Sequence, residues 1–145
     1  MAVFGSAYTV SSSFGYTGHS ASSGAGLRDG VETGATSVWG SANTASNWIK
    51  ADLGALVTVD AVQLRCIPVS FDSWGIIYIN DAIIQTSTDD STWTDRTTIT
   101  GVVEGSQSNF NLNVQARYVR VFRTSGNWLA LGDFKIDYTE ISSPR

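Results

Sequence analysis

The stretch NFNLNVQARYVRVFR, residues 109–123, decides the fold class, because apolar and polar residues alternate along it. Phe110, Leu112 and Val114 are separated by asparagines, and in the second half Val119 and Val121 lie between aromatic or charged neighbours. Such alternation is typical of a β-strand with one buried face. We therefore predict a strand whose second half has two faces, one with Arg117, Val119, Val121 and Arg123 and the other with Tyr118, Arg120 and Phe122.

The same period of two recurs on either side of this stretch, whereas a helical period is hard to find. Further strands are predicted from two sets of apolar positions, a broken run at Val57, Val59, Val62, Leu64 and Cys66 and a closing run at Phe134, Ile136 and Tyr138. Four isoleucines mark a hairpin around the turn-prone pair Asn80-Asp81, namely Ile77, Ile79, Ile83 and Ile84. Short strands separated by turns favour a sandwich or a barrel.

The composition agrees with a single antiparallel β domain. Of the 145 residues, 42% are hydrophobic and 15% are charged, which excludes a disordered chain and is unlike a helical bundle. The net charge is −4 and Lys and Arg are not clustered, so we expect no nucleic-acid partner. The single cysteine, Cys66, excludes an internal disulfide. We expect one domain over residues 1–145, with its core at about 5–138 and a tail at 139–145.

Seven segments follow one another in the order of a known family. They are Leu27-Arg28-Asp29-Gly30, Trp39-Gly40-Ser41, WIKADLG at 48–54, VDAVQL at 59–64, STDDSTW at 87–93, ARYVR at 116–120 and LGDFKI at 131–136. Together they resemble the discoidin domain, also called the coagulation factor V/VIII type C domain, whose bacterial relatives are the carbohydrate-binding modules of family 32. The resemblance implies an eight-stranded jelly-roll β-sandwich of the galactose-binding-domain type.

Most of the matching residues have structural roles in that family. The resemblance implies that Trp39, Trp48 and Trp93 pack into the core and close the ends of the sandwich, since large aromatic side chains fill such positions well. It also implies that Asp52 accepts backbone hydrogen bonds and that Arg120 is an ordered hydrogen-bond donor.

The resemblance further implies a structural calcium ion between the Asp-Gly loop and the last strand. The matching ligands are Asp29, Ser37 and Asp133, with the backbone carbonyls of Gly26 and of Val31 or Glu32. All of these supply oxygen atoms, which calcium prefers. Trp39 follows Asp29 by ten residues where the family has seven, so Thr36 is an alternative to Ser37.

In this family the ligand site lies on the loops at one end of the sandwich. Trp128, next to Asn127, matches the loop with the aromatic that stacks on a sugar ring, and its alternative role is a plug over the sandwich end. Trp74 and Asp72 match a second loop of the same end. Galactose-binding members have Pro-Arg where this chain has Pro68-Val69, so Arg65 or Arg123 would have to replace that arginine.

Catalysis is not expected from these residues. His19 is the single histidine, no G-x-S-x-G elbow is present, and no pair of carboxylates suits a glycosidase. We expect a non-catalytic module that binds glycans weakly, galactose-type glycans among them, without entering a membrane. It would act outside the cell or on a cell or virion surface, within a larger polypeptide or an oligomer. The alternative is a structural or adhesion domain of a multimeric surface or phage-tail assembly that contacts protein.

Overall fold

The computed structural model describes residues 8–12, 15–20, 39–41, 47–65, 81–100, 107–123, 129–131 and 133–141. All regular structure within these ranges is β-strand, and the strands pair antiparallel. The prediction of an all-β antiparallel fold is thus confirmed. Within these ranges, no helix has the length and apolar character that crossing a membrane requires.

The strands form two sheets. The larger sheet has the order β1 (Thr9–Ser12), β4 (Asn47–Arg65), β7 (Gln107–Arg123), β5 (Ile83–Ser87) and β6 (Thr94–Thr98), with β9 (Asp133–Glu140) also paired to β4. The smaller sheet has the order β2 (Gly15–Ser20), β3 (Trp39–Ser41) and β8 (Ala130–Leu131). The end of β9 lies two residues inside the segment expected to be the tail.

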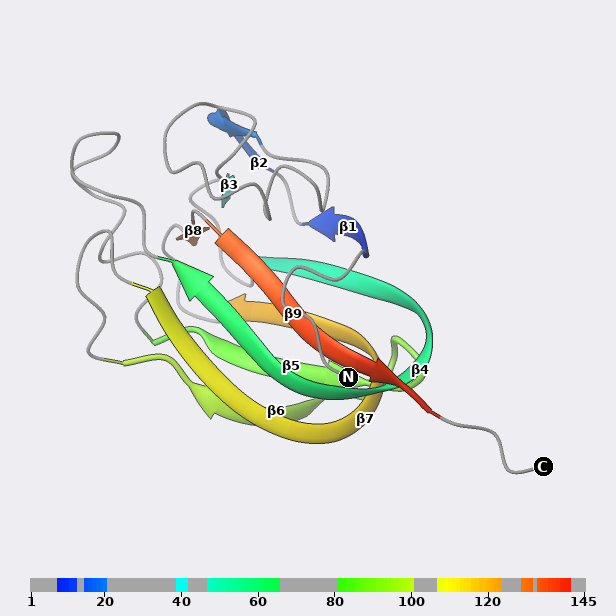
Figure 1. The fold of residues 1–145 in the computed structure, drawn as a ribbon. Helices are drawn as coiled ribbons and strands as arrows, with labels where there is room; N and C mark the ends of the chain where they lie inside the picture. Colours follow the sequence, from blue (N-terminus) through cyan, green and yellow to red (C-terminus); the bar gives the residue numbers. More distant parts are fainter. Residues whose placement is uncertain are drawn as a thin grey trace.

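The long strands β4 and β7 form a ribbon that bends back on itself (Figure 1). The first half of β4 pairs with β1 and with the second half of β7, and the second half of β4 pairs with β9 and with the first half of β7. Each long strand therefore contributes to both layers, and the apolar faces of the two halves enclose the core. The bend also brings the first and last residues of β4 to the same end of the molecule (Figure 1).

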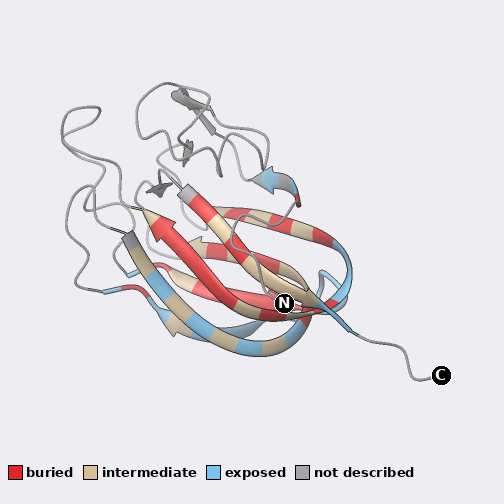
Figure 2. Ribbon diagram, viewed as in Figure 1, coloured by how far each residue is buried: buried red, intermediate tan, exposed pale blue. Residues whose placement is uncertain are grey.

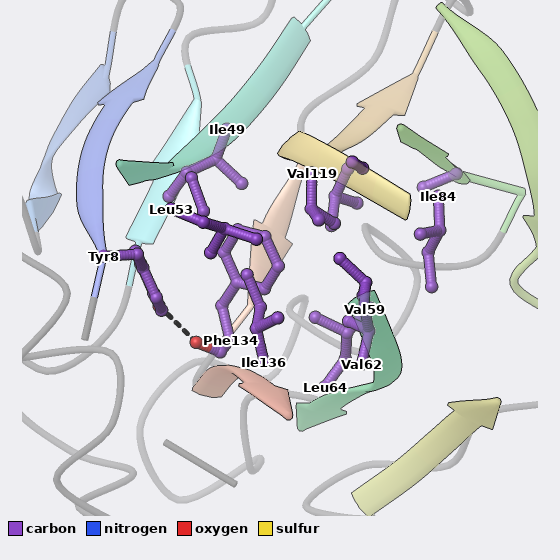
Figure 3. Packing of buried hydrophobic residues seen from close by; sticks show 14 of the residues in the cluster. Tyr8, Ile49, Leu53, Val59, Val62, Leu64, Ile84, Val119, Phe134 and Ile136 are labelled. Atoms are coloured by element: carbon purple, nitrogen blue, oxygen red, sulfur yellow. Dashed lines mark hydrogen bonds between the residues drawn. The ribbon is translucent and has the colours of Figure 1, made fainter. Parts of the chain in front are cut away.

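The core follows the alternation seen in the sequence. Buried and partly exposed residues alternate along the first part of β4 to Leu53, along β7 from Val119 and along β9 from Phe134 to Asp137, whereas partly exposed and exposed residues alternate along the first half of β7 (Figure 2). Val119 and Val121 are fully buried, as are Phe134 and Ile136 of β9. Figure 3 shows Phe134 and Ile136 between Ile49 and Leu53 on one side and Val59 and its neighbours on the other. The Tyr8 hydroxyl donates a hydrogen bond to the Phe134 carbonyl, which fastens the chain before β1 to β9 (Figure 3).

Two irregularities in the ribbon change which residues face the core. In β4 the register shifts between Val59 and Ala61, so Ala61 and Val62 are both buried. This β-bulge explains the broken apolar run of the sequence. In β7 the alternation of buried and partly exposed residues is interrupted after the buried Ala116, because the next two residues, Arg117 and Tyr118, are both half-buried. The prediction that Arg117 shares the face of Val119 was therefore wrong, because the irregularity turns its side chain outward to Asp52.

The bend itself is fixed by Asp52. The backbone N–H of Gly54 donates to Asp52 Oδ1 at 2.9 Å, as expected for an aspartate that accepts backbone hydrogen bonds. Gly54 has φ = +87°, a conformation that favours glycine. Arg117 donates to both oxygens of Asp52, at 2.9 and 3.1 Å. The hydrogen bond from Arg117 is the main reason that the pKa of Asp52 is lowered.

Part of the predicted hairpin lies outside the described residues, as does Cys66. Asp81 of the expected turn has φ = +70°, and its N–H donates to the Ile99 carbonyl at 2.7 Å. Ile83 and Ile84 enter β5, which pairs with β6 and β7.

The bulge in β4 places one carboxylate beside another, which leads to a prediction about pH. Asp137 is the Cα partner of Ala61 and lies next to Asp60. Its Oδ1 is buried and has no hydrogen-bond partner within the described part of the chain. Burial, and secondarily the charge of Asp60, raises the pKa of Asp137. The folded state therefore binds this proton more tightly than the unfolded state, and ionised Asp137 destabilises the fold at neutral pH.

Asp137→Asn should accordingly raise the urea midpoint at pH 7. As the pH falls through the raised pKa, the wild type recovers this stability, so the difference between the two proteins should shrink. Asp81→Asn removes one negative charge from an exposed turn and serves as the control. Urea unfolding at several pH values measures the effect. A midpoint for Asp137→Asn that is lower than that of the wild type at pH 7 would contradict the prediction.

Candidate functional site

The strand ends that flank the predicted ligand loops gather at one end of the sandwich. The last residues of β4 and β7, Arg65 and Arg123, both lie at the end opposite to the bend of the ribbon (Figure 1). The predicted loop with Trp74 follows Arg65 in the chain, and the predicted loop with Trp128 follows Arg123. The topology thus brings the starting points of both loops to one end, as a ligand site there requires.

Most of the predicted site residues lie outside the described residues. These are Trp128, Asn127, Trp74 and Asp72 of the glycan site and Asp29, Gly26, Glu32 and Ser37 of the calcium site. Their assignments remain predictions. Arg65 and Asp133 are described as Cα partners in β4 and β9, where Arg65 is half-buried. One residue proposed for each site is therefore placed in neighbouring strands at the loop end.

Arg123 is the more enclosed of the two arginines at this end. It is 8% exposed and is the Cα partner of Asn47, which is fully buried. Both residues have interaction partners. A buried guanidinium needs hydrogen-bond acceptors around it, so Arg123 is suited to fixing the end of the sandwich, whereas the half-buried Arg65 is the better candidate to contact a ligand.

A second group of aromatic and charged side chains covers the outside of the large sheet. Cross-strand rows run over β4, β7 and β5, and we call the surface that they form the outer face. Its rows are Trp48, Phe122 and Ile83, then Lys50, Arg120 and Gln85, then Asp52, Tyr118 and Ser87.

All three tryptophan positions assigned to the core were expected to be buried, but Trp48 and Trp93 are half-buried and outside the core cluster. Trp48 alternates with the buried Ile49, so it projects away from the core. The side chain of Trp39 lies outside the described residues.

Aromatic rings and cations alternate on the outer face. Lys50 Nζ lies 5.3 Å from the ring centroid of Trp48 and 5.7 Å from that of Tyr118. The Arg120 guanidinium carbon lies 4.1 Å from the ring centroid of Trp93 and 4.4 Å from that of Phe122. These distances are those of cation–π interactions. Arg120 Nε also donates to Gln85 Oε1 at 2.6 Å, so the prediction that Arg120 is an ordered donor is confirmed.

The turn between β5 and β6 holds Trp93 in this arrangement. Asp89 Oδ1 accepts hydrogen bonds from the N–H groups of Ser91 and Thr92, both at 2.9 Å, and these bonds lower the pKa of Asp89. Asp90 has φ = +63° and accepts two hydrogen bonds from Lys50, each at 2.8 Å. The turn is thereby tied to β4, and Trp93 follows directly.

Comparison with known proteins gives a family and a set of similar folds. The family model of the F5/F8 type C, NedA-like galactose-binding domain matches residues 27–121. No curated protein matches the sequence. Among solved structures, a fucolectin from striped bass (Morone saxatilis) serum has a TM-score of 0.77 and 20% identity, covering 93% of this chain and 46% of the lectin. The chain thus spans about half the length of that lectin.

Two bacterial modules are similar over nearly their whole length. A fucose-binding module of Streptococcus pneumoniae has a TM-score of 0.76 and 16% identity, covering 93% of this chain and 94% of the module. A CBM32 module from Clostridium perfringens, solved with GalNAc-β-1,3-galactose, has a TM-score of 0.71 and 13% identity. The match covers 94% of this chain and 99% of that module. At these identities the likeness shows a shared fold.

Proposed function

The chain belongs to the F5/F8 type C family of NedA-like, galactose-binding domains, and on that premise we propose that it is a non-catalytic module that binds glycans through the loops at one end of its sandwich. The observation that carries the proposal is the convergence of the ends of β4 and β7, which begin the loops with Trp74 and Trp128, at that end (Figure 1). Similar folds that bind fucose or GalNAc-β-1,3-galactose support glycans as the ligand class.

The proposed binding mode is stacking of Trp128 on a pyranose ring, with polar contacts from Asn127, Asp72 and Arg65. Burying about 100 Å² of apolar surface on one tryptophan contributes roughly 2.5 kcal/mol. A few hydrogen bonds add about 0.5–1.5 kcal/mol each, and association entropy removes several kcal/mol. The resulting dissociation constant is about millimolar. A module of this affinity acts through avidity, at a surface outside the cell and beside other domains or copies.

A glycan array probed with the multimerised domain tests this function. Multimers are needed because avidity makes millimolar binding detectable. We expect binding to fucosylated or galactose-type glycans. An array without any bound glycan, together with binding of the same multimer to protein ligands, would favour the alternative of an adhesion domain that contacts protein.

We also propose a structural calcium ion, held by Asp29, Ser37 and Asp133 and by the carbonyls of Gly26 and Glu32. The donor set consists of oxygen atoms, in keeping with the coordination chemistry of calcium. Its proposed role is to order the chain before β3, with no part in chemistry.

Calcium should therefore raise the melting temperature, and EDTA should lower it. An ion that binds only the folded state adds RT ln(1 + [L]/Kd) to the free energy of unfolding, about 2.7 kcal/mol at a hundredfold excess over Kd. Differential scanning calorimetry with calcium, with magnesium as the control, and with EDTA measures this. Identical melting curves in calcium and EDTA, with no metal found by elemental analysis, would exclude the ion.

A further inference from the structure

On the outer face, the guanidinium of Arg120 has hydrogen-bonding capacity that the described residues do not use. Its Nε donates to Gln85 Oε1, and its central carbon lies over the rings of Trp93 and Phe122. Within the described part of the chain, its terminal nitrogens make no hydrogen bond and neither is buried without a partner. Both terminal nitrogens therefore reach solvent, where they present a planar fork of N–H donors.

Within the described residues, the positive charge of Arg120 also has no carboxylate paired directly with it. Arg120 is the direct cross-strand partner of Lys50, and like charges in such a pair destabilise a sheet. Lys50 is bound by both oxygens of Asp90. Asp95 accepts a hydrogen bond from Gln85 Nε2 at 2.6 Å, and no described carboxylate forms an ion pair with the Arg120 fork. Burial lowers the pKa of Arg120, and the negative charges of Asp90 and Asp95 offset only part of this decrease.

We propose that the Arg120 fork, between the rings of Trp93 and Phe122, is a second binding site, which takes the carboxylate or sulfate group of an acidic saccharide. A guanidinium matches such an oxyanion with two parallel hydrogen bonds, and its stacking on aromatic rings holds the fork in place. The half-exposed Trp93 supplies an apolar surface beside the fork for the C–H groups of the sugar ring. The site lies on the sheet, apart from the loop-end site of the proposed function.

An NMR titration of the whole, ¹⁵N-labelled chain tests the proposal. The probes are tetragalacturonate for the carboxylate, a heparin tetrasaccharide for the sulfate, maltotetraose as the neutral control and a tetraglutamate peptide. We expect tetragalacturonate or the heparin tetrasaccharide to shift the Arg120 Nε–H and Trp93 indole N–H signals, and maltotetraose to leave them in place. Equal shifts with maltotetraose, or shifts with tetraglutamate alone, would overturn the proposal.

Two matched variants separate the fork from simple charge. Arg120→Lys keeps the charge and loses the fork, so binding of the acidic probe should weaken by roughly tenfold or more. Arg117→Lys is the control, because Arg117 also lies over a ring, 5.1 Å from the centroid of Tyr118, but its Nε and one of its terminal nitrogens already form a bidentate pair with Asp52. The affinity of Arg117→Lys for the acidic probe should lie within about twofold of that of the wild type, because this substitution also keeps the positive charge. Equal affinities for both variants would refute the role of Arg120.

A third variant distinguishes this site from the loop-end site. Trp128→Ala, which removes the proposed stacking residue of the loops, should bind tetragalacturonate as the wild type does. Loss of the acidic probe in this variant would assign it to the loops and overturn the second site. If Arg120→Lys fails to fold, as seen by thermal unfolding, the comparison of acidic and neutral probes on the wild type and on Trp128→Ala still decides the question.

Discussion

Phe134→Ala is expected to lower the free energy of unfolding by about 3–5 kcal/mol, the range found for removing a buried aromatic side chain. Phe134 is fully buried and is among the largest enclosed side chains of the core. Its ring centroid lies 5.5 Å from that of Tyr8, so the substitution removes an aromatic contact as well as filling volume (Figure 3). Urea unfolding followed by tryptophan fluorescence measures the loss.

The matched control for this substitution is Phe122→Ala. Phe122 is half-buried on the outer face, where its ring contacts the Arg120 guanidinium. Its removal leaves the core cluster intact and should cost about 1–2 kcal/mol, from partial burial and one cation–π interaction. If the two variants lost the same amount of stability, the division into an enclosed core and an outer face would be wrong.

The sequence was sufficient to predict the β fold and most of its buried face. Alternation is a local property of the chain, and it correctly separated Val119 and Val121, which are buried, from Arg120, which lies on the opposite, half-buried face. It failed at Arg117, because an irregularity in the ribbon changes the facing of every residue on one side of it. The irregularity comes from pairing with β4 around Gly54, which lies more than fifty residues away in sequence.

Alternation predicted that Tyr118, Arg120 and Phe122 share one face of β7, but it could not predict that Trp93 joins them. Trp93, Arg120 and Phe122 meet only because β5, β6 and β7 pair in one register, and the resemblance alone assigned Trp93 to the core. On the outer face, the Arg120 cation contacts the ring of Trp93, and this cation–π interaction stabilises the large ring there although it is half-exposed. A sequence signal was nevertheless present, since Arg120 follows Tyr118 by two residues and shares its face.

The loop residues of the candidate site have no periodicity from which a side-chain direction could be inferred. Short segments rich in Gly, Ser and Asn take their conformation from turn geometry and from their anchors. Sequence reasoning could therefore select Trp128 by resemblance and by its surroundings, and its role is best decided by mutation.

Trp128→Ala is expected to abolish glycan binding and to leave the fold intact. Loss of a stacking surface worth roughly 2.5 kcal/mol is close to a hundredfold in affinity. For a ligand that binds at about millimolar, the remaining affinity lies beyond detection. The fold should persist because the next residue, Leu129, is fully buried and already anchors the chain at this point. Thermal unfolding and titration with a fucosylated or galactose-type glycan, on the same preparation, measure both effects.

Trp93→Ala provides the matched tryptophan control, and it should show the opposite pattern. Its ring contacts Arg120 and meets the Tyr118 ring edge-on at 6.5 Å, so its loss should cost about 1–3 kcal/mol of stability. Because the outer face is separate from the loops, binding of the neutral glycan should remain. The assignment of Trp128 would be refuted by a variant that still binds like the wild type, or by one that unfolds, since an aromatic plug of the sandwich end would be needed for folding itself.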